Sequence, residues 1–584
     1  MSCRKLAALL VVLSAFVAAP AQAAPERPSR VVLIVLDQAR PDTIQRYDME
    51  NVKALMRRGA SFRNGIVGHM AAETVISHSV LTSGLLPRRM GWANEVHRDV
   101  DGVLGTPGEL YVTSSMSCSQ FRSLTEAGRY RRIADYLDAE FGEDSKFVSI
   151  AQKRTAACTA GHSGSVADGT LGDPEDIIFQ IRGSSSPTAC DPTYQTSGWR
   201  QPEFVSGSPP PAYFGLAFPC SRWSTWQGAG AYGTGGLLPA SIYPLEGDRF
   251  VPGRDDLHVG GDNWSADAAI RVIEADPGWR GIMVSLGAID KMGHMWGPED
   301  EVTGPPGSDQ ELIHLPFAAK NADEQVGRIV DALRDKGILD ETLIVVTADH
   351  AAQTGRPFHG RFDGPLTSGG VRCDSVNGSS GLRSDCNWYY GQDADENYRD
   401  PSPAVAALRA ALTPSGGDPV ADTNLRFSYQ DGHVAAWLND NSAANQHQAA
   451  QAVLAMPGVI ASYHLNATQD GYIRYGTNKT TGHERAWFVQ HGDELVDTMA
   501  APFGPDVVGL LQTDVTYGVV GDHGGHNRLI QEIPMIFAGP GVGGKDPNRR
   551  MRLVDVTPTV LDLMKIEYDP ADFDGEAVKL PKAK

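Results

Sequence analysis

The sequence predicts an α/β fold, with a mostly parallel central sheet that is flanked by helices and carries an inserted α+β cap. Strand-like and helix-like segments alternate along most of the chain, and this alternation implies parallel strands with helices on both faces of the sheet. The first run, Val31–Leu36, is continuously apolar and mostly β-branched, which is typical of a strand buried on both faces. Two long stretches, residues 160–260 and 355–500, leave this rhythm and indicate insertions.

The expected elements follow in chain order. Later strands are expected where apolar runs recur, at Ser61–Val67 (or an extended turn), Lys146–Gln152, Gly281–Asp290, Glu341–His350 and Ile533–Gly539. Helices are expected at Glu50–Arg58, from about Val75, at Tyr130–Phe141, Ser265–Ala275 and Pro316–Lys336, and near Pro558. The second insertion predicts a helix, a hairpin and a helix at Pro403–Leu412, Leu425–Leu438 and Ala443–Leu454. The core then comprises residues 24–354 and 501–584, with a first insertion at about 160–260, and residues 355–500 form the cap.

The first 23 residues have the layout of a cleavable secretory signal. Arg4 and Lys5 precede the apolar run Leu6–Val17, and Ala21-Gln22-Ala23 offers a cleavage site. An uncleaved anchor is the alternative, but this run is short for a bilayer. We therefore expect a periplasmic or secreted protein with no membrane association after cleavage.

The net charge restricts the partners. Loss of the two basic signal residues changes the formal charge from −20 to −22 (−20 − 2). A negative surface argues against nucleic acid as a bulk partner, because phosphate backbones require basic patches. A small anionic substrate stays compatible, since a bound metal ion can outweigh the global field.

Six cysteines remain after signal removal, an even number that suits up to three disulfides in an exported protein. They are Cys118, Cys158, Cys190, Cys220, Cys373 and Cys386. Cys373 and Cys386 flank a Gly/Ser/Asn-rich loop and form the most favoured pair. A cysteine zinc site is disfavoured, because no C-x2-C spacing occurs.

Acids and histidines recur where the predicted strands end. They are Asp37, Asp290, His294, Asp349, His350 and His523. Carboxyl ends of parallel strands meet at one sheet edge, where α/β proteins bind ligands. Any single pair is explained by a helix cap or a polar turn, but the whole set suits two zinc-like ions. In a helical turn, Asp290 and His294 share one face and bind one ion together.

Two such ions would clamp the attacking and leaving oxygens of an in-line displacement, which requires a nucleophilic hydroxyl. Thr74 is the candidate, because it precedes the predicted helix from about Val75. Backbone N–H groups at a helix start suit an anionic phosphoryl oxygen. The alternative is that Thr74 is only the N-cap of this helix.

These motifs resemble the alkaline phosphatase superfamily, and most closely its type I phosphodiesterase/nucleotide pyrophosphatase branch and bacterial phosphatases with a Thr nucleophile. The resemblance rests on the segments that begin at Asp37 and Glu73, on Asp290-x3-His294, on Ala348-Asp349-His350, on His523-Gly524 followed by Ile533-Pro534, and on Arg552–Met564. It spans residues 31 to 564 but leaves both insertions unmatched.

The resemblance implies a fold, a metal centre and a mechanism. One zinc ion would be held by Asp290, His294 and His523, with His526 as a competitor for His523. The other would be held by Asp37, Asp349, His350 and the Thr74 oxygen. The phosphoryl group would transfer to Thr74 with inversion, and a metal-bound hydroxide would then release it with a second inversion.

Departures from the family pattern bear on the substrate. Asn94 is expected to contact a phosphoryl oxygen, although it lies one position early, and an ordinary turn residue is the alternative. Related monoesterases carry Lys-x-Arg after the second core strand, whereas this chain has Gln152-Lys153-Arg154. Arg154 then occupies the position of the Arg in that motif and is the candidate substrate contact. Lys153 is expected to point away from the site, because side chains alternate in direction along an extended segment. One lost cation favours diesters over monoester dianions.

The sequence therefore predicts an exported enzyme that hydrolyses phosphodiester or nucleotide pyrophosphate bonds. A broad alkaline phosphomonoesterase is the second hypothesis, and a metal-bound binding protein without turnover is the third. Sulfatases share the fold but use a C-x-P-x-R motif, which does not surround Thr74. Related phosphoglycerate mutases are cytoplasmic, which conflicts with the export signal.

Overall fold

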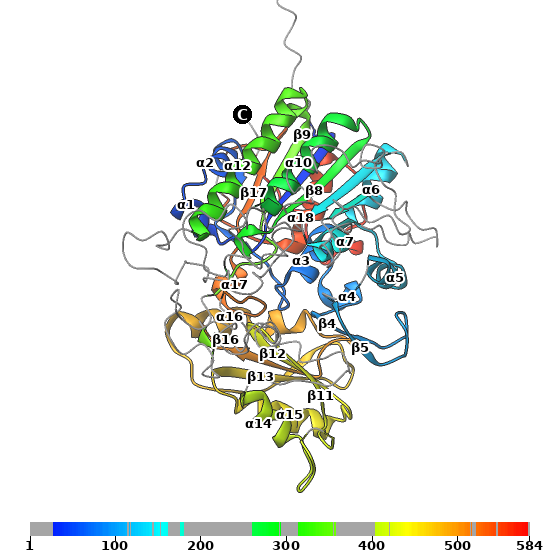
Figure 1. Cartoon of the computed structure of the whole chain (residues 1–584), viewed down its shortest axis with the longest axis vertical. Helices are drawn as coiled ribbons and strands as arrows, with labels where there is room; N and C mark the ends of the chain where they lie inside the picture. Colours follow the sequence, from blue (N-terminus) through cyan, green and yellow to red (C-terminus); the bar gives the residue numbers. More distant parts are fainter. Residues whose placement is uncertain are drawn as a thin grey trace, which may run out of the picture.

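Figure 1 shows a computed structural model of the whole chain. The structure describes residues 27–161 except 114–115, 117, 143–144 and 152, then 176–179, 260–290, 293, 314–353, 356–357, and 403–581 except 420, 514, 517–520 and 545–546. The predicted signal segment, His294 and four of the cysteines (Cys190, Cys220, Cys373 and Cys386) lie outside these residues.

The core is built on a seven-stranded sheet in the order β2-β17-β9-β1-β8-β6-β7. These strands span Ala60–Ser61 (β2), Met535–Ala538 (β17), Thr342–Thr347 (β9), Arg30–Leu36 (β1), Trp279–Leu286 (β8), Lys146–Ala151 (β6) and Asp176–Phe179 (β7). The strands from β9 to β7 run parallel, while β17 is antiparallel to both of its neighbours. The predicted fold class, a mostly parallel sheet, is confirmed.

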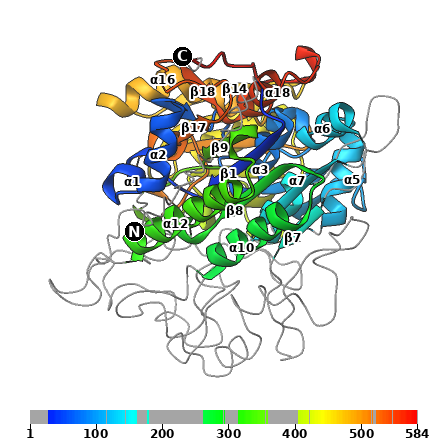
Figure 2. The ribbon, with the colours of Figure 1, turned by 90° about the horizontal axis from the view of Figure 1, so that it is seen from above.

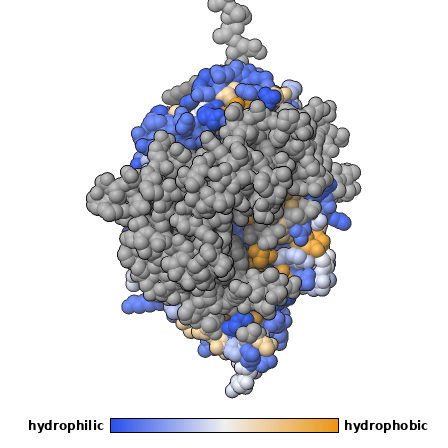
Figure 3. All heavy atoms as spheres, viewed as in Figure 1, coloured by the Kyte–Doolittle hydropathy of each residue, from blue (hydrophilic) through white to orange (hydrophobic). Residues whose placement is uncertain are grey.

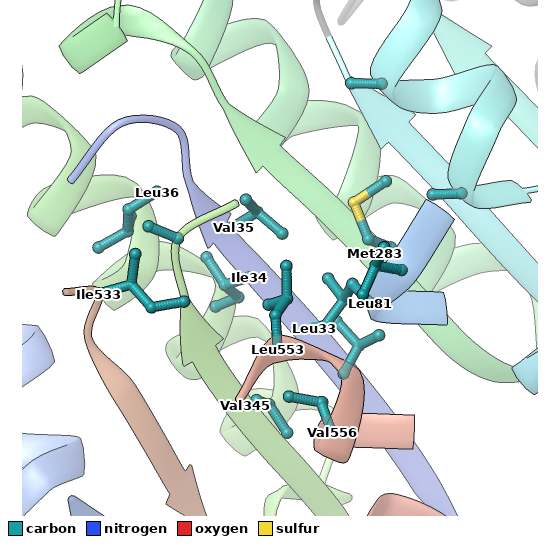
Figure 4. Packing of buried hydrophobic residues seen from close by; sticks show 14 of the residues in the cluster. Leu33, Ile34, Val35, Leu36, Leu81, Met283, Val345, Ile533, Leu553 and Val556 are labelled. Atoms are coloured by element: carbon teal, nitrogen blue, oxygen red, sulfur yellow. The ribbon is translucent and has the colours of Figure 1, made fainter. Parts of the chain in front are cut away.

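Helices cover both faces of this sheet (Figure 2). On one face lie α2 (Glu50–Arg58), α10 (Gly260–Ala275) and α12 (His314–Asp335). On the other lie α3 (Thr74–Ser83), α6 (Ile133–Phe141), α7 (Arg154–Gly161) and α18 (Val556–Met564). The central strand β1 is therefore enclosed on both faces, and every residue of Val31–Leu36 is fully buried. Figure 4 shows its side chains packed against Leu81, Met283 and Val345 from the surrounding elements.

The cap forms a second body at the end of the core where α3 and α17 (Arg528–Gln531) lie (Figure 1). Its antiparallel sheet has the order β11-β12-β15-β13-β14. These strands span Leu425–Gln430 (β11), His433–Leu438 (β12), Val507–Leu511 (β15), Val459–Leu465 (β13) and Tyr472–Thr477 (β14). The cap helices are α14 (Pro403–Ala411), α15 (Ala443–Leu454) and α16 (Gly482–Asp497). The predicted cap boundary at residue 500 is too early, because β15 pairs with β12 and β13 in the middle of this sheet.

Shorter elements complete the described chain. They are α1 (Pro41–Arg46), β3 (Asn64–Ile66), α4 (Pro87–Met90), β4 (Val96–Asp99), β5 (Glu109–Val112), α5 (Cys118–Gly128), β10 (Arg356–Pro357), β16 (Val515–Thr516) and β18 (Arg550–Arg552). Among the few described residues of the first predicted insertion is a strand that was not expected from the sequence, β7, which extends the core sheet beside β6. Its short run of only four residues explains why periodicity did not reveal it.

No helix among the described residues is both long enough and apolar enough to cross a membrane. In Figure 3, the described atoms that are visible belong mostly to hydrophilic residues. The large apolar side chains that are exposed in the described part are Val100, Ile473 and Val489. Scattered apolar residues of this kind are ordinary on a protein surface.

A disulfide joins Cys118 of α5 to Cys158 of α7, whereas the favoured pair, Cys373 and Cys386, lies outside the described residues. The bridge spans a sequence separation of 40 residues, and both cysteines are buried. Closing a loop of this length is worth about 4 kcal/mol of unfolding free energy in the chain-entropy model. The double variant Cys118→Ser/Cys158→Ser should lose about that much in urea unfolding. An unchanged midpoint in urea would show that this bridge does not stabilise the fold.

Candidate metal and nucleophile site

The carboxyl ends of β1, β8 and β9 bring three buried aspartates together. Asp37 directly follows β1, and Asp349 is separated from the end of β9 by one residue. Asp290 lies in the helical turn of residues 288–290 after β8. The parallel register sets these ends side by side, and the Asp37 backbone N–H donates to the carbonyl of Leu286 at 3.0 Å. Each of the three aspartates is at most 1% exposed. The sheet edge expected from the sequence is therefore formed.

Two groups of side chains are arranged so that each could hold a cation. In each group the donor atoms lie within 4.8 Å of one another. One group is Asp37, Asp349 and His350, and the other is Asp290, His350 and His523. The first is the predicted ligand set without Thr74. The second contains two of the three predicted ligands, with His350 beside them, while His294 lies outside the described residues.

The charge and hydrogen bonding of the three aspartates fit divalent cations. Among the described residues, Asp37 Oδ1 and Asp349 Oδ2 accept no hydrogen bond, although both are buried. Burial raises the pKa of Asp37, and the neighbouring carboxylates of Asp290 and Asp349 raise it further. Burying several carboxylates together is costly without compensating positive charge. Carboxylate and imidazole donors around a shared space are a ligand set that zinc-like ions accept.

Thr74 is the first residue of α3 and faces the same space. Its Oγ1 lies 3.4 Å from His350 Nε2, and its side chain is almost fully buried. The N-cap of α3 is Glu73, which is extended, so Thr74 lies inside the helix. The alternative that Thr74 is only a cap is therefore not supported. The first-turn N–H groups of a helix lack intrahelical partners and attract an anionic group at this position.

Lys153 lies in the site, which overturns the expectation that it points away. Its Nζ is 3.2 Å from Thr74 Oγ1, 2.6 Å from Asp290 Oδ2 and 2.8 Å from Asp37 Oδ2. Burial lowers the pKa of Lys153, but the carboxylates of Asp290 and Asp37 outweigh this effect and raise it, so the ammonium stays charged. The expectation failed because β6 ends at Ala151 and Lys153 lies in a bend before α7, where strand alternation no longer applies.

Gln38 and His78 support the site. Gln38 has a left-handed backbone (φ 68°), its N–H donates to Asp349 Oδ1 at 3.3 Å, and its Nε2 donates to Asp290 Oδ1 at 3.2 Å. Such a conformation in a residue other than glycine often marks a functional site. His78, one turn after Thr74, contacts the Thr74 carbonyl oxygen at 2.8 Å, and its Nδ1 is 3.5 Å from Asp349 Oδ2. Gln38 went unnoticed in the sequence because a glutamine after a strand carries no specific signal.

His523, and not its rival His526, takes part in the ligand groups. The imidazoles of His350 and His523 stack with centroids 3.8 Å apart, and His523 Nε2 is 3.6 Å from Asp290 Oδ1. His526 packs edge-on against Phe488, and burial lowers its pKa to about 3. A buried imidazole in an apolar setting suits a packing role. The expectation that His523 is the ligand, with His526 as its competitor, thus agrees with the geometry.

The predicted substrate contacts are less defined. Asn94 is fully buried, and its Nδ2 donates to His433 Nε2 at 2.9 Å, a residue of the cap. Burial lowers the pKa of His433 to about 4, so its neutral imidazole can accept this bond. Arg154 begins α7, so its backbone lies beside the site. A phosphoryl contact by either residue stays a prediction.

Comparisons with known proteins agree with this geometry. The type I phosphodiesterase / nucleotide pyrophosphatase family matches residues 31–104 and 251–363, which include Asp37, Thr74, Asp290 and Asp349. The alkaline phosphatase PhoD of Zymomonas mobilis is 24% identical over 590 residues, covering 94% of this chain and 88% of that protein. A calcium-transporting ATPase of Myroides odoratus is 27% identical over 203 residues, 30% of this chain and 35% of that protein.

Among solved structures, the wild-type alkaline phosphatase PafA has the same fold. It superposes with a TM-score of 0.57 at 15% identity, and the match covers 95% of this chain and 99% of PafA. A quadruple variant of PafA matches with a TM-score of 0.58, at the same identity and coverage. The chain is therefore similar to the type I phosphodiesterase / nucleotide pyrophosphatase family in those two segments, and it has an alkaline-phosphatase-like fold.

Proposed function

We propose that the protein hydrolyses phosphate esters through a phosphothreonine intermediate on Thr74, at a site that binds two divalent ions, most suitably zinc. The observation that carries this proposal is the convergence of Thr74 Oγ1, the Asp37–Asp349–His350 group and the Asp290–His350–His523 group in one buried space. Such a set combines an oxygen nucleophile with ligands for two cations. When bound, the ions would supply Lewis-acid stabilisation of charge and would acidify the attacking hydroxyl.

The chain's own residues then have distinct roles. The Thr74 oxygen attacks phosphorus, a new Oγ–P bond forms, and the P–O bond to the leaving group breaks. Lys153, 3.2 Å from Thr74 Oγ1, places a positive charge beside the phosphoryl group. The N-terminus of α3 directs backbone N–H groups to its oxygens. Water then attacks the phosphothreonine, which releases phosphate and restores the Thr74 hydroxyl.

The position of Lys153 changes the balance between the two substrate hypotheses. The preference for diesters rested on a missing cation, and Lys153 supplies one within reach of the nucleophile. A monoester dianion carries more charge than a diester and gains more from a nearby ammonium. We therefore place phosphomonoester hydrolysis first. Phosphodiester or nucleotide pyrophosphate hydrolysis remains the second candidate, because the matching family is named for it.

A panel of substrates tests this order. We expect a higher kcat/KM for p-nitrophenyl phosphate than for bis-p-nitrophenyl phosphate or a dinucleotide pyrophosphate. Chelation should abolish all activity, because it removes the ions that would acidify the Thr74 hydroxyl, and added zinc should restore it. A preference for the diester or the pyrophosphate would reverse the order. A protein that binds two ions but turns over none of these substrates would support the third hypothesis, a binding role.

Export to the periplasm or outside the cell is part of the same proposal. It is supported by the predicted signal in residues 1–23 and by the disulfide between Cys118 and Cys158, because such bonds persist in oxidising compartments. Fractionation of cells that express the full chain would test it. Activity and the shortened chain should appear together in the periplasmic or culture fraction.

A further inference from the structure

The tip of the cap hairpin lies directly against the loop that carries His523. Asp431 and Gly432 form the turn between β11 and β12. The Gly432 N–H donates to the His523 carbonyl at 2.7 Å. A Cβ atom on Gly432 would come within 2.1 Å of the Gly524 carbonyl oxygen, so only glycine allows this approach. The cap therefore reaches the backbone of a candidate metal ligand through one turn.

The same turn places a carboxyl group behind the imidazole of His523. Asp431 Oδ2 lies 3.7 Å from His523 Nδ1, while His523 Nε2 faces Asp290 Oδ1 on the opposite side of the ring at 3.6 Å. A histidine that binds a metal through one ring nitrogen usually donates its other N–H to a carboxylate or carbonyl, which fixes the tautomer and the ring orientation. In this structure Asp431 lies on the Nδ1 side of the His523 ring, beyond ordinary hydrogen-bond distance, and Asp290 of the ligand group lies on the Nε2 side.

Asp431 is itself held in place by Tyr429 of the hairpin and by Thr516 of β16. The Tyr429 hydroxyl donates to Asp431 Oδ2 at 3.2 Å, and the Thr516 hydroxyl donates to the Asp431 carbonyl oxygen at 3.2 Å. The Asp431 side chain is buried, so bulk water does not compete for its oxygens. One hydroxyl thus holds the Asp431 carboxyl group and another holds its backbone, so this side chain can orient a neighbouring ring.

We propose that Asp431 is a positioning residue, which holds the His523 imidazole through Nδ1 and thereby leaves Nε2 directed to the ion shared with Asp290. The cap then completes the metal centre in addition to covering it. This inference rests on the proposed function, because it takes His523 to be a metal ligand.

The cap has a separate attachment to the core, which supplies a matched control. Arg98 of β4 pairs with the buried carboxylate of Asp506 at 3.1 and 2.6 Å, and Asp506 also accepts the N–H of Leu438 at 2.8 Å. Asp506→Asn therefore weakens a buried link between core and cap. Among the described residues, Asp506 has no contact with the two ligand groups. A loss of metal binding that came only from a loosened cap would appear in this variant too.

The experiment measures zinc affinity by competition with a chromophoric chelator, together with thermal unfolding of the metal-free protein. Wild type should bind two ions per chain. Asp431→Ala should weaken one of the two affinities about 10- to 100-fold and leave the other unchanged. Asp431→Asn, whose amide oxygen can still accept the Nδ1–H bond, should recover most of the loss. Asp506→Asn should lower the unfolding temperature and keep both affinities.

The outcomes separate this inference from the proposed function. Two wild-type affinities in Asp431→Ala would overturn the positioning role and leave the two-ion site intact. Equal weakening in Asp506→Asn would also overturn it, since the effect would then be structural. A wild-type protein that binds no zinc would refute the proposed metal centre itself, and the positioning role with it.

Discussion

Thr74→Ala is expected to lower kcat by at least about 10⁴-fold on every phosphate ester, because it removes the oxygen that we propose forms the covalent intermediate. The variant should still bind two ions per chain, since Asp37, Asp349 and His350 keep their mutual distances. Steady-state rates and metal analysis on the same preparations give both readouts. Quench of the wild-type reaction in acid should trap phosphate on Thr74, and the variant should trap none.

Two variants control this result. Thr74→Ser keeps a nucleophilic hydroxyl at the start of α3 and should retain measurable turnover. Ser83→Ala removes a buried hydroxyl at the far end of the same helix, where it donates to the Ser79 carbonyl, and should be close to wild type. Survival of more than a tenth of the activity in Thr74→Ala would mean that a water molecule attacks directly, and the phosphothreonine would be discarded.

Lys153→Ala is expected to discriminate between ester classes. We expect kcat/KM on p-nitrophenyl phosphate to fall about 10²- to 10³-fold, in the range found when one preorganised donor is removed from developing charge. The rate on bis-p-nitrophenyl phosphate should change by less than about tenfold, because a diester carries less charge for the ammonium to stabilise. Side-by-side kinetics of both substrates measure the ratio.

The matched control is Lys146→Ala, which removes the lysine at the start of β6, the strand that precedes Lys153. Lys146 pairs with Asp276 at 2.8 Å, at the opposite end of β6 from Lys153. Its variant should keep the wild-type ratio between the two substrates. Equal losses on both esters in Lys153→Ala, together with lost metal content, would assign Lys153 to holding Asp37 and Asp290 and not to the substrate.

The sequence predicted that acids would gather at one edge of the sheet, because local signals mark such positions. An apolar strand that stops at an acid is visible in one dimension, and Asp37, Asp290 and Asp349 each end such a run. The cap hairpin Leu425–Leu438 and the helix Ala443–Leu454 were also expected at the positions observed, since alternation and helical periodicity are strong there. The fold class follows from these elements in order.

Four of the failures share one cause, which is that they depend on contacts between distant segments. The bend after β6 that directs Lys153 to Thr74 breaks the strand periodicity on which the expectation relied. In the sequence, β15 cannot be distinguished from a core strand, because an apolar run does not reveal which strands it will pair with. The bridge between Cys118 and Cys158 and the contact between Asp431 and His523 likewise require the folded arrangement.

Because the cap is inserted into the core sequence, its position also determines when a newly synthesised chain can assemble the ligand site. Asp349 and His350 precede the cap in sequence, and His523 follows it, although these side chains share one ligand space. The site therefore cannot form until the cap has been synthesised and its ends have met, which is a closure over a long loop. Contacts so distant in sequence form slowly. A chain that stops during synthesis or is cut within the cap would retain Thr74 but would lack a complete set of ligands. We therefore expect such a partial chain to be catalytically inactive.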